Sequence, residues 1–81
     1  MKEIILVGAN WCGSCKLMKE WFFSVELPGI ILNYRDVEEI AVKITSVPVI
    51  LFKENDEIIQ ELVGAISKAD LIKNAKSIFE E

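Results

Sequence analysis

The most informative stretch of the sequence is Trp11-Cys12-Gly13-Ser14-Cys15, which holds both cysteines of the chain. It follows the apolar run Ile4-Ile5-Leu6-Val7, which is typical of a buried strand, and it precedes a segment with helical periodicity. A C-x-x-C pair at such a junction places the first sulfur at a helix start, where free backbone N–H groups and the helix dipole favour a thiolate. The second sulfur lies one turn further on, close enough to attack a disulfide formed on the first. The pair therefore suffices for reversible dithiol–disulfide chemistry.

Length and composition predict one small domain that spans residues 1–81. The 52% share of hydrophobic residues favours a compact core over disorder. No apolar run approaches the roughly 20 residues that cross a bilayer. The first residues lack the pattern of a signal peptide, so we expect a cytoplasmic protein. A disulfide over so short a loop would constrain the unfolded chain little, which argues against a purely stabilising role. In a reducing cytosol such a pair is more typical of catalysis or metal binding.

The net charge of −4, from nine basic and thirteen acidic residues, argues against a nucleic-acid partner. The sequence holds no cluster of lysine and arginine that would neutralise phosphates. Acidic runs occur at residues 36–39 and 54–57. We interpret them as solvated turns and helix starts, with a docking role as the less favoured alternative.

The periodicity of the apolar residues predicts elements in the order β-α-β-α-β-β-α. The expected strands cover residues 4–9, 30–34, 47–52 and 58–63, with a polar turn at 53–57 joining the last two as a hairpin. Asp36 with Glu39, and Ser67 with Asp70, have the spacing of helix-capping boxes. The expected helices cover residues 12–26, residues 37–44 with Ala41 on the inner face, and a C-terminal segment that opens at Ser67. We therefore expect an α/β fold in which a four-stranded mixed sheet is flanked by three helices.

The Trp-Cys-Gly-x-Cys stretch after the first strand resembles that of the thioredoxins. Val47-Pro48 stands where that family carries a cis-proline, and Gly64-Ala65 is similar to the glycine of its substrate loop and the residue after it. These three loop motifs occur in the family's order, and the resemblance covers nearly the whole chain. It implies the thioredoxin fold at a minimal, glutaredoxin-like size, since the chain lacks the extra N-terminal strand and helix of ordinary thioredoxins.

Three positions depart from the patterns of the thioredoxins or the glutaredoxins. Ser14 replaces the usual proline between the cysteines, which is expected to alter the helix start. Leu6 stands where thioredoxins have a buried Asp that is assigned a proton relay, so water or a nearby acid or lysine would have to replace that Asp. Asn10 stands where a glutaredoxin lysine helps to bind glutathione, which makes glutathione the weaker candidate for the reductant.

Cys12 is the expected nucleophile and Cys15 the expected resolving thiol. The chain has no histidine, so the Cys12 thiolate has to be stabilised by the helix start and local N–H donors rather than by an imidazole. No metal site is expected, because the chain's two cysteines are half of the four ligands that a zinc or iron–sulfur site needs. Only a dimer could complete such a site.

The expected substrate-binding residues are Trp11, Gly13, Ser14, Val47, Pro48, Gly64 and Ala65. Trp11 would offer an exposed flat surface to substrate peptides, with packing inside its own loop as the alternative. A cis bond before Pro48 would turn the Val47 backbone outward to pair with an extended substrate, whereas a trans proline would open an edge strand. Gly64 would let the substrate backbone approach closely, and a plain strand-ending glycine is the alternative.

The resemblance implies a monomeric protein-disulfide reductase that acts on disulfide-containing protein substrates. A flavoprotein of the thioredoxin-reductase type is expected to reduce the Cys12–Cys15 disulfide again. We expect no bound cofactor, and neither nucleic acid nor membrane as a partner. Two alternatives stay open. One is a glutaredoxin-like dedicated electron donor, for instance to ribonucleotide reductase, and the other is a non-enzymatic thioredoxin-fold subunit that binds a partner or holds metal.

Overall fold

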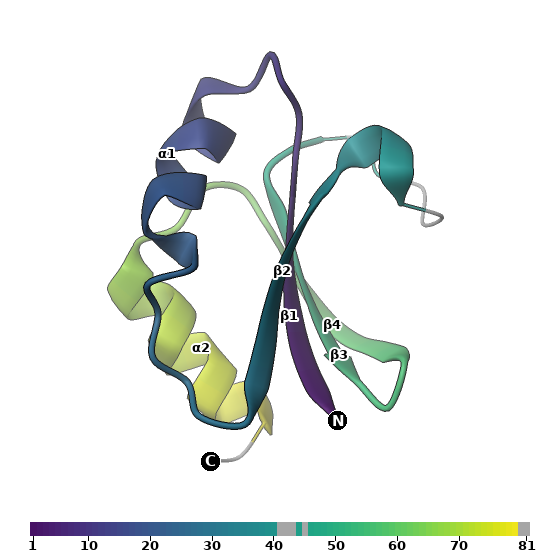
Figure 1. Cartoon of the computed structure of the whole chain (residues 1–81), viewed down its shortest axis with the longest axis vertical. Helices are drawn as coiled ribbons and strands as arrows, with labels where there is room; N and C mark the ends of the chain where they lie inside the picture. The colour runs from purple at the N-terminus through teal and green to yellow at the C-terminus, as the bar shows by residue number, and fades with distance from the viewer. Residues whose placement is uncertain (41–43, 45, 80–81) are drawn as a thin grey trace.

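One mixed sheet of four strands organises the fold, in the order β2-β1-β3-β4 (Figure 1). The computed structural model describes residues 1–40, 44 and 46–79. Its elements in chain order are β1 (Lys2–Gly8), α1 (Gly13–Phe22), β2 (Ile30–Asp36), a short 3-10 helix η1 (Val37–Glu39), β3 (Val49–Glu54), β4 (Glu57–Val63) and α2 (Lys68–Phe79). β1 pairs in parallel with β2 and antiparallel with β3, and β4 completes the hairpin with β3. The expected four-stranded mixed sheet is confirmed.

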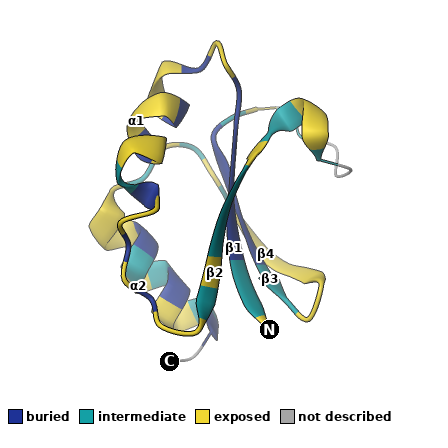
Figure 2. Cartoon of the chain, in the orientation of Figure 1, coloured by how far each residue is buried: buried dark blue, intermediate teal, exposed yellow. Residues whose placement is uncertain are grey.

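Both α-helices lie against the same face of the sheet (Figure 1), and dark, buried positions alternate with exposed ones along them (Figure 2). The alternation of side chains along β1 divides its apolar run between the two faces. Ile4 and Leu6 belong to the large core cluster on the helix side, and Ile5 and Val7 belong to a smaller cluster on the other side. The large cluster also takes in Met18, Phe22, Ile50, Phe52, Leu71, Ala75 and Phe79.

The prediction of three helices is wrong for the part of the chain that the structure describes, which holds two α-helices. The expected capping box forms: the Asp36 side chain accepts a hydrogen bond from the backbone of the first turn, and the Glu39 side chain accepts one from the Asp36 N–H. It caps only η1. Ile40 already has extended backbone angles, with φ −102° and ψ 139°. Its β-branched side chain has a low preference for a helix and packs on the sheet beside Val37 and Ile44. Ala41, expected on the inner face of this helix, lies outside the described residues.

The first helix is shorter than predicted at its C-terminal end. The Ser24 hydroxyl donates a hydrogen bond of 2.6 Å to the Trp21 carbonyl oxygen, and the Ser24 N–H donates to the same oxygen. A serine that bonds locally in this way competes with the helical pattern, so the chain turns soon after Phe22. Val25 nevertheless stays buried, whereas Leu17, which has the spacing of the inner face, is exposed.

The β3–β4 connection is tighter than the predicted five-residue turn. Only Asn55 and Asp56 separate the strands, and their φ angles are +53° and +70°. Two successive positive φ angles give the turn that matches the twist of paired strands, and Asn and Asp tolerate that conformation better than other side chains do. Lys53, Glu54 and Glu57 can therefore extend the strands.

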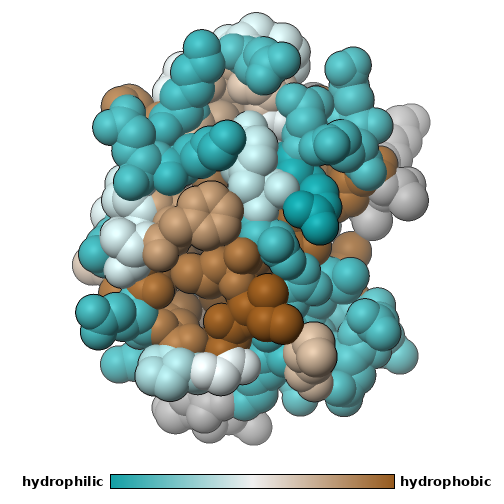
Figure 3. Space-filling model, viewed as in Figure 1, coloured by the Kyte–Doolittle hydropathy of each residue, from teal (hydrophilic) through white to brown (hydrophobic). Residues whose placement is uncertain are grey.

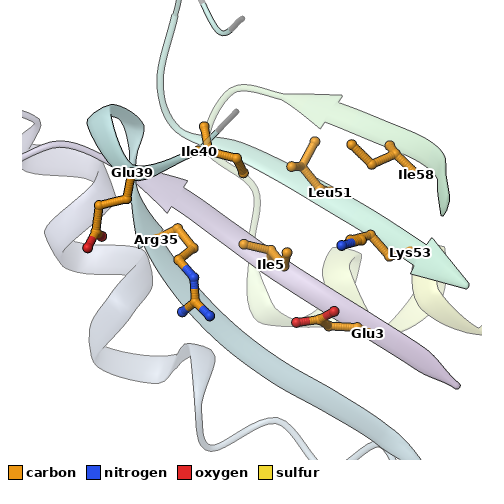
Figure 4. Close-up of a pocket in the computed structure, with 8 residues that line it drawn as sticks. All are labelled: Glu3, Ile5, Arg35, Glu39, Ile40, Leu51, Lys53 and Ile58. Carbon is orange, nitrogen blue, oxygen red and sulfur yellow. The ribbon is translucent and has the colours of Figure 1, made fainter. Parts of the chain in front are cut away.

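The sheet face opposite the α-helices carries a pocket of about 290 Å³ (Figure 4). Its described lining comprises Glu3, Ile5, Arg35, Glu39, Ile40, Leu51, Lys53 and Ile58. Apolar side chains from β1 and β3 lie between charged ones, and neither cysteine takes part. This pocket therefore lies apart from the C-x-x-C pair.

The surface shows where the two layers meet. Figure 3 shows hydrophobic residues gathered between the helical layer and the sheet, surrounded by hydrophilic ones. Several side chains pack only partly buried against the large cluster, among them Trp21, Ile30, Leu32, Ile72 and Ile78. Within the described residues, no helix has both the length and the apolar character needed to cross a membrane.

Candidate active site

The C-x-x-C pair lies between the end of β1 and the start of α1. Cys12 is the N-cap of α1, and Cys15 lies in its first turn. The two side chains are joined by a disulfide, and their Cα atoms are 5.3 Å apart. A turn in which the Cys12 N–H donates to the Ala9 carbonyl, at 3.1 Å, connects the pair to β1. The predicted placement of the first sulfur at a helix start is therefore confirmed.

The surroundings of the two sulfurs differ. The Cys12 Sγ accepts a hydrogen bond of 3.2 Å from the Cys15 backbone N–H, and it lies 3.6 Å from the Ser14 hydroxyl oxygen. The exposed fraction is 7% for Cys12 and 1% for Cys15. Hydrogen-bond donors at a helix N-terminus stabilise a thiolate on Cys12, and burial disfavours one on Cys15. Cys12 is therefore the more exposed of the two cysteines, and its sulfur lies next to a backbone N–H and a hydroxyl at the helix start.

The loop before β3 reaches the cysteines from another part of the sequence. Val47 packs against a small buried cluster formed by Ala9, Cys12 and Cys15. The Val47–Pro48 peptide bond is cis, as predicted, and Pro48 is buried. The sequence alternative of a trans proline is therefore wrong.

Gly64 joins the site through Pro48. Its N–H donates a hydrogen bond of 2.9 Å to the Pro48 carbonyl oxygen, next to the paired residues Val49 and Val63. Gly64 has a φ of +104°, which favours glycine, and Ala65 lies exposed after it. The Val47-Pro48 and Gly64-Ala65 motifs are thus joined by a hydrogen bond, and Val47 packs against the cysteines of the third motif.

Trp11 stands out at the surface of the site, with 79% of its side chain exposed. The alternative that it packs inside its own loop is therefore wrong. Gly13 and Ser14 are exposed beside it. A pocket of about 120 Å³ lies next to Trp11 and is lined by Trp11, Val37, Ile44, Ser46 and Val47. A second pocket shares Trp11 and Val37 with the first and includes the acidic residues Asp36 and Glu38.

Sequence reasoning missed two residues at the site, Gly8 and Tyr34. A Cβ atom placed on Gly8 would lie 2.7 Å from the Tyr34 Oη and 2.9 Å from the Cys15 Cβ. The lack of a side chain at position 8 therefore lets both the Tyr34 phenol and Cys15 pack closely against Gly8. Gly8 follows the apolar run by one residue, but only the pairing of β1 with β2 reveals what it faces.

The charges around Tyr34 come from three elements. The Lys19 Nζ lies 4.2 Å from the centroid of the Tyr34 ring, in a cation–π contact. Burial raises the pKa of Tyr34 above its usual value, and the carboxylates of Asp36 and Glu39 raise it further. The phenol therefore keeps its proton at neutral pH.

Among the described residues, no three side chains of His, Cys, Asp or Glu come together. The two sulfurs are bonded to each other. The geometry favours dithiol–disulfide exchange as the chemistry of the site.

No protein-family profile and no curated protein sequence matches the chain. Solved structures do. A mutant thioredoxin from Halobacterium salinarum NRC-1 is similar with a TM-score of 0.83 and 22% identity, over 95% of this chain and 74% of that one. Thioredoxin f from spinach chloroplast, in its long form, is similar with a TM-score of 0.77 and 18% identity, over 96% of this chain and 70% of that one. Together with the element order and the placement of the C-x-x-C pair, these likenesses show that the chain has the thioredoxin fold.

Proposed function

We propose that the protein is a thioredoxin-like protein-disulfide reductase. The observation that carries the proposal is the asymmetry of the cysteine pair. Cys12 is the more exposed of the two, and its sulfur faces a backbone N–H and the Ser14 hydroxyl at a helix start. Cys15 is buried directly behind it. Cys12 is therefore the nucleophile and Cys15 the resolving thiol.

The proposed cycle has two exchange steps. The Cys12 thiolate attacks one sulfur of a target disulfide, which forms a mixed disulfide and releases the other target sulfur as a thiolate. The Cys15 thiolate then attacks the Cys12 sulfur, which forms the Cys12–Cys15 disulfide and releases the second target sulfur. The target gains two electrons, and the pair loses them.

Substrate binding is assigned to the loops around the pair. The backbone at Val47 would pair with an extended substrate segment, in the manner of an added strand. Gly64 leaves the neighbouring backbone open, and Trp11 supplies an exposed aromatic surface. The small pocket between Trp11 and Val47 would hold a side chain next to the target cysteine. Gly13, Ser14 and Ala65 complete the proposed contact surface.

The remaining expectations form part of the proposal. The protein acts as a cytoplasmic monomer on disulfide-containing proteins. A flavoprotein of the thioredoxin-reductase type returns the pair to the dithiol. No bound cofactor is required for the two exchange steps.

Reduction of insulin disulfides tests the function. We expect turnover with NADPH and thioredoxin reductase. Activity found only with glutathione and glutathione reductase would favour the dedicated-donor alternative. Stoichiometric metal binding with neither activity would favour the non-enzymatic subunit and overturn the proposal.

Two variants test the roles of the cysteines. Cys15→Ser is expected to attack once and to accumulate as a mixed disulfide on Cys12, which mass spectrometry detects. Cys12→Ser is expected to form no such adduct and to lose insulin reduction, because the buried thiol is left alone. Equal adducts on both variants would show that the assignment of roles is wrong.

A further inference from the structure

The second exchange step needs a proton to leave a buried sulfur. Cys15 is 1% exposed, and no polar or charged side chain is buried among the described residues. Burial in apolar surroundings disfavours the thiolate that must attack Cys12. A partner able to stabilise that thiolate therefore has to reach Cys15 from the edge of the core.

The sheet places one polar side chain, that of Tyr34, near Cys15. It is the register partner of Leu6 in the parallel pairing of β1 with β2. Paired residues point to the same face of a sheet, and Gly8 is the next β1 residue on that face. The phenol accordingly packs against the large core cluster on the helix side.

The phenol hydroxyl and Cys15 both pack against Gly8, which leaves them as neighbours around the same point. The same point, the position of an added Cβ on Gly8, lies 2.7 Å from the Tyr34 Oη and 2.9 Å from the Cys15 Cβ. Within the described part of the chain, the hydroxyl has no hydrogen-bond partner. A side chain on Gly8 would overlap both groups and force at least one of them to move.

The surroundings of Tyr34 keep it protonated and hold its ring. Lys19 of α1 lies over the ring face, and Asp36 at the end of β2 and Glu39 of η1 are the carboxylates that act on the phenol. Burial and these two carboxylates raise the pKa of Tyr34, so the hydroxyl is a hydrogen-bond donor and not a base at neutral pH.

We propose that Tyr34 is a positioning residue for the second exchange step, whose hydroxyl donates a hydrogen bond to the Cys15 thiolate. This inference rests on the proposed function. The Cys15 proton passes to water, the thiolate held by Tyr34 attacks the Cys12 sulfur, and the target leaves as a thiolate. Tyr34 keeps its own proton throughout, so it neither adds a proton to the reaction nor removes one.

The test separates the two exchange steps with Ellman's reagent. The first thionitrobenzoate is released when Cys12 attacks, and the second when Cys15 displaces it from the mixed disulfide. In Tyr34→Phe, which keeps the ring, we expect the second release at neutral pH to slow by about tenfold, since a hydrogen bond to a charged group is worth about one pKa unit or more. Its pH profile should move upward by about one unit, while the first release stays unchanged.

The thiolate itself is measured in the Cys12→Ser background, where Cys15 is the only thiol. The pH dependence of Cys15 alkylation by iodoacetamide, followed by mass spectrometry, is expected to give a pKa about one unit higher with Phe at position 34 than with Tyr. Tyr34 is the only tyrosine of the chain, so biosynthetic incorporation of fluorotyrosine changes this phenol alone. The more acidic hydroxyl should shift the Cys15 pKa downward, opposite to Phe, and this arm stands even if Tyr34→Phe fails to fold.

The outcomes separate the two proposals. An unchanged Cys15 pKa in both arms, or an equal slowing of both releases, would overturn the role of Tyr34. Lys19→Gln serves as a control that removes a cation near the ring but leaves the hydroxyl, and it should slow the second release less than Tyr34→Phe does. A protein that shows these effects with Ellman's reagent but does not reduce insulin would refute the proposed function alone.

Discussion

At the scale of single residues, Gly8 decides how closely the sheet, Tyr34 and Cys15 pack. We predict that Gly8→Ala lowers the free energy of unfolding by about 1–3 kcal/mol, because the added methyl group overlaps both the phenol oxygen and the Cys15 Cβ. Urea denaturation monitored by tryptophan fluorescence measures the change. In the Tyr34→Phe background the loss should be smaller, since one of the two overlapping atoms is gone.

The matched control is Gly13→Ala, in the same loop region. A Cβ on Gly13 would have no heavy atom within 4 Å, and the residue opens α1. Its free energy of unfolding should therefore stay unchanged or rise by up to about 1 kcal/mol. An equal loss in the Gly8 and Gly13 variants would contradict the steric account.

At the scale of elements, the β3–β4 hairpin holds Asp56 in a backbone conformation that suits glycine, with φ +70°. We predict that Asp56→Gly raises the free energy of unfolding by about 0.5 kcal/mol, because relief of the left-handed conformation exceeds the added entropy of the unfolded chain. The melting temperature should rise by about 2–4 °C. Asp70→Gly, in the first turn of α2, is the control and should lower it, since a glycine in a helix is destabilising. A lower melting temperature in the Asp56 variant would refute the prediction.

At the scale of the whole molecule, we expect the fold not to depend on the Cys12–Cys15 disulfide. The bridge joins cysteines only three positions apart, so it removes little entropy from the unfolded chain. We predict that reduction lowers the free energy of unfolding by no more than about 2 kcal/mol and leaves the protein folded. Urea curves with and without dithiothreitol measure the difference, and a variant with serine at both cysteine positions should not respond to the reductant. Unfolding on reduction would contradict this prediction.

The sequence by itself determined the features that depend on neighbouring residues. The apolar runs gave the strands, the spacing of Asp36 and Glu39 gave a capping box, and the Ser67 hydroxyl accepts from the Asp70 N–H at the start of α2. The position of Cys12 at a helix start follows in the same way, because a strand followed by a periodic segment fixes where the helix begins. These interactions are local, so their pattern is visible in the chain.

Only the tertiary structure decided which distant residues meet. The capping box predicted a full helix, but Ile40 leaves the helical conformation and packs on the sheet instead. The contact of Val47 with the cysteine cluster, and the approach of Tyr34 to Cys15, depend on strand order and register. A shift of one residue in that register would turn Tyr34 to the other face. Register is set by the packing of the whole sheet, and no local pattern contains it.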